Sequence, residues 1–136
     1  VAGSLNNLAL LYYSQGRYSN AEPLYVEALE MTKRLFAGDH PNVAINLNNL
    51  AVLYKSQGRD SDAKPLYIEA LAMRKRLFAG DHLDVATSLN NLAFLYYSQG
   101  RYSDAEPLYV EALEMTKRLF AGDHPNVAIS LNNLSE

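Results

Sequence analysis

The chain has 136 residues, of which 49% are hydrophobic and 20% are charged, so it can form one ordered domain and is not a disordered tail. Its formal net charge of −3 disfavours nucleic-acid binding, no apolar run is long enough to cross a membrane, and the N-terminus lacks a signal-peptide pattern. The absence of cysteine excludes disulfides, thiolate metal sites and cysteine nucleophiles, and we expect a cytoplasmic protein with neither nucleic-acid nor membrane partners.

A 42-residue repeat organises the whole sequence. The motif Leu-Asn-Asn-Leu-Ala begins at Leu5 and returns 42 and 84 residues later, and Phe-Ala-Gly-Asp-His recurs with the same period. We therefore divide the chain into repeats over residues 1–42, 43–84 and 85–126, followed by a partial repeat over 127–136. The first and third repeats differ at only three positions, so the middle repeat supplies most of the variation.

The first segment of each repeat predicts a helix. At the start of the second repeat, Pro41 can occupy the first helical position, and Asp39 or His40 can cap the helix. Gly58 is predicted to end this helix, because glycine readily adopts the left-handed conformation found just after many helices. Between these signals the apolar residues follow at helical spacing: Val43, Leu47, Leu50, Ala51 and Tyr54.

The second helix of each repeat is predicted to begin just after a Gly-Arg turn. Ser19 and Glu22 have the spacing of a capping box, in which each side chain satisfies a free backbone N–H at the helix start, and the third repeat has the same pair. The middle repeat carries Lys64 in place of the glutamate, so we expect a weaker cap there. Pro23 and its copies fall in the first turn or just past it, which favours a new helix over a continuation of the previous one.

The second helix also carries an apolar stripe, which ends at Gly38. Small residues at positions 9, 21 and 28 are expected where two helix backbones approach most closely. No segment alternates with a period of two, so we predict no strand. Because one hairpin cannot bury its stripe alone, successive hairpins should stack into an all-α solenoid. The stripe consists of Ala21, Leu24, Tyr25, Ala28, Leu29, Leu35 and Phe36.

This pattern of small and large residues over a helix-turn-helix resembles the tetratricopeptide-repeat family. The matching residues are Asn7, Leu8, Ala9, Tyr12, Gly16, Tyr18, Ala21, Tyr25 and Ala28. The repeat of 42 residues is longer than the usual ~34, and Lys33 replaces the family's proline near the end of the second helix, so that helix should run on. The longer motif is similar to the 42-residue variant of kinesin light chains and of bacterial, especially cyanobacterial, proteins. The resemblance implies an all-α, right-handed α-α superhelix.

Residues that could carry chemistry are scattered rather than clustered. His40, His82 and His124 lie in the same turn of successive repeats, ~10 Å apart for packed helices, which is too far for two of them to bind one metal ion. Ser14 and its copies lie beside glycine turns without a histidine to activate them. No acidic pair occupies an apolar pocket, and no glycine-rich phosphate loop is present. We therefore expect no metal, no cofactor and no enzymatic activity.

The positions that differ among repeats gather on one side of the first helix. Positions 3, 10 and 13 and their copies are separated by seven and then three residues, which brings them onto one helix face. The resemblance implies that this face lines a concave groove holding a peptide, where asparagine amides can pair with a peptide backbone. The predicted peptide-binding residues are Asn6, Asn7, Leu10, Tyr13, Asn48, Asn49, Val52, Lys55, Asn90, Asn91, Phe94 and Tyr97.

Other interpretations of these residues stay open. One asparagine of each pair could equally form hydrogen bonds with a neighbouring helix, and free variation on an exposed face would give the same differences among repeats. A second variable stripe runs along the second helix at Glu22, Val26 and Glu30 and their copies. Its spacing of four residues leads us to interpret it as the convex, solvent-facing side.

Two functions fit this sequence. The leading hypothesis is a protein-interaction scaffold whose groove binds a peptide. The alternative is a self-associating array without a specific ligand, in which the first repeat of one copy packs after the third repeat of another. We expect residues 1–136 to form a single solenoid taken from a longer array, because Val1–Leu5 lacks the Asp-His-Pro lead-in and Leu131–Glu136 stops within a first helix.

Overall fold

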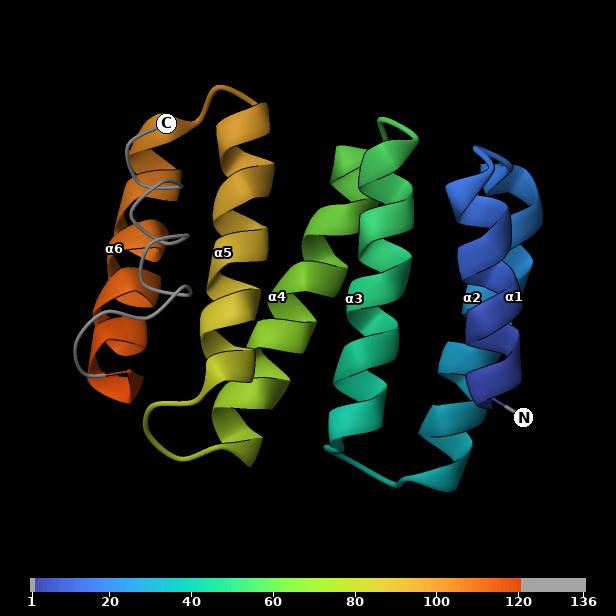
Figure 1. Ribbon diagram of the computed structural model, residues 1–136, viewed down its shortest axis with the longest axis horizontal. Helices are drawn as coiled ribbons and strands as arrows, with labels where there is room; N and C mark the ends of the chain where they lie inside the picture. Colours follow the sequence, from blue (N-terminus) through green and yellow to red (C-terminus); the bar gives the residue numbers. More distant parts are fainter. Residues whose placement is uncertain (1, 121–136) are drawn as a thin grey trace. The chain divides into compact units, whose positions relative to one another are not determined.

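A computed structural model describes residues 2–120 of the chain, and this part consists of six α-helices and no strand (Figure 1). The predicted all-α, helical-repeat architecture is confirmed. The partial repeat over residues 127–136 and His124 lie outside the described residues. The helices are α1 (Ala2–Ser14), α2 (Tyr18–Leu35), α3 (Pro41–Ser56), α4 (Asp60–Leu77), α5 (Leu83–Ser98) and α6 (Tyr102–Leu119).

The chain divides into two compact units, Val1–Met73 and Arg74–Glu136, and the boundary falls inside α4. In the first unit α1 packs against α2, and α2 packs against α3; in the second, α5 packs against α6. Each repeat therefore contributes two antiparallel helices joined by a short turn, as Figure 1 shows for α5 and α6.

The histidine turns begin the first helices of the second and third repeats. The Nδ1 atom of His40 accepts a hydrogen bond of 3.0 Å from the backbone N–H of Asn42, with Pro41 at the start of α3. The Nδ1 atom of His82 accepts the equivalent bond from Asp84 at the start of α5. These bonds satisfy helix N–H groups that have no partner within the helix. The predicted cap by His40 is thus confirmed.

Glycines in the left-handed region separate the two helices of each repeat. Gly16 and Gly58 have φ angles of 75° and 76°, which a residue with a side chain rarely adopts. The chain then reverses within two residues, since the N–H of Arg17 bonds to the carbonyl of Tyr12 at 2.8 Å. The predicted helix end at Gly58 is confirmed.

The predicted capping box at the start of the second helix is wrong. Helix α2 begins at Tyr18, so Ser19 lies inside it, and the capping residue is Arg17, whose side chain makes no capping hydrogen bond. Helix α6 likewise begins at Tyr102, one residue before Ser103. The reason is the tight reversal: the carbonyl of Arg17 already accepts the N–H of Ala21, so the helix has started before Ser19.

The hydrophobic core consists mainly of small and aliphatic residues from facing helices. Ala9, Ala21 and Ala28 are all 0% exposed, as expected of small residues placed between packed helices. Leu47 in the first unit and Leu89 in the second are also fully buried. Most of the predicted stripe of α2 is buried, but the inclusion of Leu35 is wrong: this last residue of α2 presents its side chain to solvent and is 67% exposed.

Candidate functional site

Position 10 of each repeat presents an apolar side chain to solvent. Leu10 on α1, Val52 on α3 and Phe94 on α5 are 55%, 37% and 49% exposed. Exposed large apolar side chains are ordinary when single, but here one recurs at the same position of all three first helices that the structure describes. The recurrence makes this helix face the strongest candidate for contact with a partner.

The two asparagines of each Asn-Asn pair have different surroundings. Asn6 donates a hydrogen bond of 2.7 Å from its Nδ2 to the Oδ1 of Asn46 on α3, so it contacts a neighbouring helix. Asn48, its copy on α3, is buried, whereas Asn7 is exposed and Asn49 is half-buried. The second asparagine of each of these pairs is therefore the more accessible. On α5, Asn90 and Asn91 are both half-buried.

The tyrosines at position 13 join neighbouring elements. The hydroxyl of Tyr13 lies 2.7 Å from the Oγ of Ser56, at the end of α3, and its ring packs on Tyr18 with centroids 5.3 Å apart. Tyr97 packs between Phe94 and Tyr102, at 6.3 and 5.4 Å. Lys55, the copy of Tyr13 in the middle repeat, is half-buried. Contacts with neighbouring aromatic rings thus hold Tyr13 and Tyr97 in place in the first and third repeats.

Three charged residues of the first unit form a cluster around Arg59. Arg59, in the turn before α4, lies 3.1 Å from the carboxylate of Glu22 and 2.9 Å from that of Asp62. The same guanidinium stacks over the ring of Tyr54 at 4.2 Å, a geometry repeated by the equivalent arginines and tyrosines of the other repeats. Burial raises the pKa of Tyr54, and the Glu22 carboxylate raises it further. These contacts connect repeats, so part of the predicted solvent-facing stripe serves stability.

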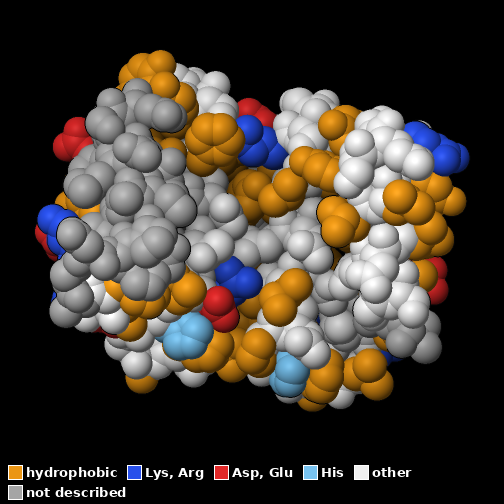
Figure 2. All heavy atoms as spheres, in the orientation of Figure 1, with side chains coloured by type: hydrophobic (Ala, Val, Ile, Leu, Met, Phe, Trp, Pro, Cys, Tyr) orange, Lys and Arg blue, Asp and Glu red, His pale blue; other side chains and the backbone are white. Residues whose placement is uncertain are grey.

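In the turns that precede α3 and α5, each histidine stacks on a phenylalanine. His40 stacks on Phe36 and His82 stacks on Phe78, with centroids 3.6 and 3.7 Å apart, and Figure 2 shows histidines lying among hydrophobic side chains. Within residues 2–120, no group of three or more His, Asp or Glu side chains could hold a metal ion. No helix in the same part of the chain is long and apolar enough to cross a membrane.

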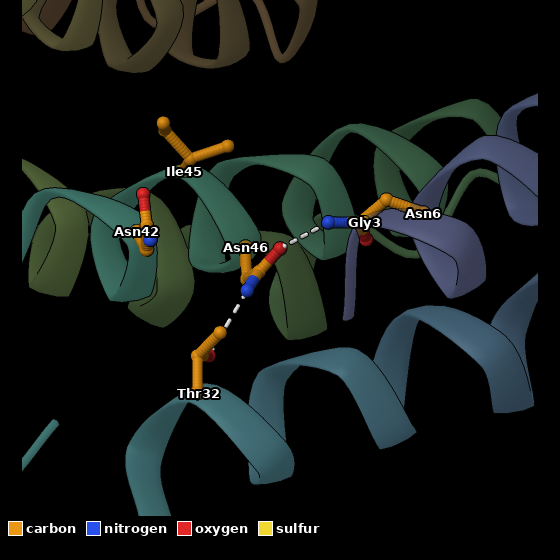
Figure 3. A pocket seen from close by; sticks show the side chains of 6 residues that line it. All are labelled: Gly3, Asn6, Thr32, Asn42, Ile45 and Asn46. Atoms are coloured by element: carbon orange, nitrogen blue, oxygen red, sulfur yellow. Dashed lines mark hydrogen bonds between the residues drawn. The ribbon is translucent and has the colours of Figure 1, made fainter. Parts of the chain in front are cut away.

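Two junctions between repeats are built by residues that the sequence analysis did not select. At the first junction, Asn46 on α3 donates from Nδ2 to the Oγ1 of Thr32 on α2 at 2.9 Å (Figure 3). At the second junction, Arg74 on α4 donates from a terminal nitrogen to the Oγ of Ser88 on α5, also at 2.9 Å. The sequence did hold a signal, because the middle repeat differs from the other two at both positions: it has Arg74 where they have Thr32 and Thr116, and Asn46 where they have Ser4 and Ser88.

A small pocket of about 180 Å³ opens at the first junction. Figure 3 shows Asn46 between Thr32 and Asn6, with its side chain bonded to both. Asn6 is therefore the one predicted site residue that lines this pocket, and the other predicted residues lie elsewhere on the first helices. The lining residues are Gly3, Asn6, Thr32, Asn42, Ile45 and Asn46.

Comparison with known protein families gives a match over the whole chain. Residues 1–76, 56–118 and 84–136 each match the family model described as tetratricopeptide repeat. No curated protein matches the chain.

Solved structures with the same fold include BtubC (BKLC) from P. vanneervenii, with a TM-score of 0.88 and 30% identity over 98% of this chain and 53% of that one. A kinesin light chain with nearly identical TPR-like repeats from Podosopora anserina gives a TM-score of 0.87 and 21% identity over 97% of this chain and 63% of that one. This chain thus spans about half to under two thirds of these proteins.

The N-terminal domain of stress-induced protein-1 (STI-1) from C. elegans is a more distant neighbour. It gives a TM-score of 0.69 and 16% identity over 99% of this chain and 94% of that one. At such low identity, this similarity and that to the P. anserina protein concern the fold alone.

Proposed function

This chain belongs to the tetratricopeptide-repeat family, and from that premise we propose that it is an interaction scaffold that binds a peptide segment along the exposed face of its first helices. Repeats of this family generally mediate protein–protein interaction, and the fold is generally a non-catalytic scaffold. The binding face consists of the accessible asparagines and the apolar side chains at position 10 of each repeat. A single array over residues 1–136, a cytoplasmic location and the lack of nucleic-acid or membrane partners remain predictions from the sequence.

The observation that carries this proposal is the exposure of Leu10, Val52 and Phe94 at one equivalent position. Covering them with a partner removes apolar surface from water, which is the main favourable term in most protein association. Asn7 and Asn49 lie next to the same face and offer both a donor and an acceptor to a peptide backbone. Apolar contacts and backbone pairing together suit an extended or helical peptide.

The face carries almost no charge, which bears on the kind of peptide. Helix α1 contains no charged residue, α3 contains only Lys55, and α5 contains only Asp84 in its first turn. Charged pairs across an interface mainly increase association rate and salt dependence. A peptide bound here should therefore be selected for apolar and uncharged polar side chains, and its affinity should change little with salt.

The test is a peptide-display selection against the chain, followed by affinity measurements with variants. We expect Phe94→Ala and Asn49→Ala to weaken selected peptides by roughly fivefold or more, as for central interface residues. Glu114→Ala is the matched control, because Glu114 is exposed on α6 and its copy in the middle repeat is Ala72. Equal binding by the parent chain and both face variants would reject the proposal.

One observation favours the second candidate function, head-to-tail self-association. Leu8 and Leu11 on α1 are 41% and 52% exposed, whereas their copies Leu50 and Leu53 on α3 are 5% and 0% exposed. The first repeat thus leaves open an apolar surface of the kind that the second repeat buries. If this surface binds another copy, the mass measured by light scattering will rise with concentration, and Leu11→Glu will abolish the rise. A constant monomer mass for the parent chain would reject self-association.

A further inference from the structure

The two histidines that cap helices can do so only while their imidazole rings are neutral. The Nδ1 atoms of His40 and His82 each accept a hydrogen bond of 3.0 Å, from the backbone N–H groups of Asn42 and Asp84. A ring nitrogen that accepts a hydrogen bond carries no proton, so the single proton of each neutral ring resides on Nε2. Protonation of Nδ1 would turn the acceptor into a second donor facing the helix N–H, and the capping bond would be lost.

The location of the rings adds a second penalty for the charged form. Both rings lie at the N-terminus of a helix, α3 or α5, where the helix dipole disfavours a cation. Each ring stacks on a phenylalanine, Phe36 or Phe78, with interplanar angles of 9°. A flip of the ring within its own plane would keep this stacking but would place the Cδ2 carbon against the helix N–H. A protonated ring therefore has no stacked orientation that restores the cap.

The sign of the pH response follows from this geometry. Histidine is the side chain whose charge ordinarily changes between about pH 5 and pH 8. Because the capped form has no proton on Nδ1, acidification favours the states in which the cap is broken. The stabilisation by a cap is thus present at neutral pH and above, and it is lost as the pH falls through the range in which the ring takes up a proton. Packing is affected too, since Val43 and Ala44 in the first turn of α3 are 1% and 0% exposed.

Charged groups surround the histidine that precedes α5. The Asp84 carboxylate lies 3.9 Å from the Nδ1 of His82 and would attract a protonated ring. From α4, Arg74 donates to the carbonyl of Asp84 at 3.2 Å, and from α6, Arg118 donates to the carboxylate of Asp81 at 2.6 and 2.9 Å. Each arginine thus lies beside an aspartate, and the charged group close to Nδ1 is a carboxylate. An ion pair with Asp84 would offset part of the loss when His82 becomes protonated.

The histidine that precedes α3 has no such carboxylate on its helix. The residues at the places of the aspartate and of the buried arginine are the neutral Asn42 and Thr32. Helix α1 contains no charged residue, and the nearby Lys33 lies 3.9 Å from Glu69 of α4. The charged residues of the loop and of the last turn of α2 are Asp39, Lys33 and Arg34, and all three have identical counterparts before α5. The charge difference between the two caps therefore lies at Asn42 and Thr32.

We propose that the histidine caps make this protein sensitive to pH, and that acidification destabilises the first unit through His40 more than the second unit through His82. Both neutral rings hold their helix starts at neutral pH. When the rings are protonated, His82 exchanges its cap for an ion pair with Asp84, whereas His40 loses its cap without that compensation. This response goes beyond the proposed peptide binding and does not depend on it.

The experiment is urea unfolding at pH 7.5 and pH 5.5 of the parent chain and three variants. His40→Asn supplies an acceptor that does not titrate in this range, so its unfolding equilibrium constant should rise roughly fivefold less on acidification than that of the parent, as for loss of one N-cap. Asn42→Asp gives the first cap the carboxylate of the second and should also reduce the rise. His82→Asn is the matched control and should reduce it less than His40→Asn.

Hydrogen exchange followed by mass spectrometry at the same two pH values shows which unit responds. After correction for the intrinsic pH dependence of exchange, acidification should lower the protection of α3 more than that of α5, and His40→Asn should remove this difference. An equal pH response of the parent and His40→Asn would overturn the proposal. So would a reduction by His82→Asn as large as that by His40→Asn, because the Asp84 carboxylate would then provide no compensation.

Discussion

In both junctions a longer side chain donates a hydrogen bond to a shorter one. The longer side chain lies on the later helix at the first junction and on the earlier helix at the second. At the first, the long group is Asn46 on α3 and the short one is Thr32 on α2; at the second, the long group is Arg74 on α4 and the short one is Ser88 on α5. Both donor–acceptor distances are 2.9 Å. Arginine and serine together are longer than asparagine and threonine, so the two junctions reach the same hydrogen-bond distance with side chains of different length.

The junctions differ most in charge. Arg74 is only 6% exposed, whereas the first junction buries only neutral groups. A buried charge depends on its matched partners, and removing one partner destabilises a protein far more than replacing the whole set with neutral groups. The residue pairs of the two junctions should therefore not be interchangeable one residue at a time.

The largest effect is expected when one half of the second junction is transplanted into the first. Thr32→Arg would place a guanidinium against Asn46 and Asn42 without an acidic partner, which should lower the free energy of unfolding by about 3 kcal/mol. Urea unfolding followed by circular dichroism measures the change. Lys33→Arg, at the exposed neighbouring position, is the control and should have little effect.

Completing the transplant should recover much of that loss. The triple variant Thr32→Arg, Asn46→Ser, Asn42→Asp reproduces the second-junction set, so its urea midpoint should lie well above that of Thr32→Arg alone. If the triple variant is no more stable than the single one, the two junctions are not alternative solutions of one contact.

Equivalent substitutions in the hydrophobic core should destabilise the two units by similar amounts. Leu47 and Leu89 are copies of each other and are both 0% exposed. Leu47→Ala and Leu89→Ala should each cost about 3 kcal/mol, since each removes buried methyl groups and leaves a cavity. Comparison of the two urea curves checks this expectation. A difference as large as the effect itself would mean that the repeats are not equivalent even in their cores.

A smaller effect is expected at the histidine caps. His40→Ala and His82→Ala each remove the acceptor for one helix N–H and the ring that stacks on Phe36 or Phe78. Loss of an N-cap typically costs about 1 kcal/mol. Thermal unfolding provides the measurement, with His40→Asn as the matched variant that keeps a capping acceptor. A destabilisation by His40→Asn equal to that by His40→Ala would argue against capping.

The smallest effects should come from exposed ion pairs, and these also differ between units. In the second unit, Arg118 donates two hydrogen bonds to Asp81, at 2.6 and 2.9 Å, and these bonds lower the pKa of Asp81 below its usual 3.8. A lowered carboxyl pKa stabilises the fold above pH 3.8, and that stabilisation is lost as the pH falls through the folded-state pKa. In the first unit, Lys33 and Glu69 lie 3.9 Å apart.

Asp81→Asn should therefore lower the urea midpoint slightly at neutral pH and not at strongly acidic pH. Glu69→Gln should have a still smaller effect at either pH, because its longer contact is well exposed to solvent. Matched unfolding curves at the two pH values test both statements. An Asp81→Asn effect that persists at acidic pH would show that the charge of Asp81 is not its cause.

Local signals in the sequence predicted most of the fold. The helix period, the glycine ends and the His40 cap each depend on a few adjacent residues, and the structure confirms them. The capping box failed although its residues are also local, because the Tyr12–Arg17 reversal starts α2 before Ser19. The preceding turn, and not the capping-box sequence, therefore determines where α2 begins.

The junctions and their pocket could not be derived in the same way. Thr32 and Asn46 are 14 residues apart across a turn, and their contact depends on how α2 packs on α3. The joint change of these positions in the middle repeat was visible, but its meaning requires knowing which helices touch. The pocket likewise depends on which helices meet, because its lining residues come from α1, α2 and α3.

The most direct test of the central claim, that the first-helix face binds a peptide, is chemical-shift mapping with a display-selected peptide on the ¹⁵N-labelled chain. The account predicts that the largest shifts fall on Asn7, Asn49 and Phe94. Largest shifts on the second helices, at Val26 or Ile68, would contradict it.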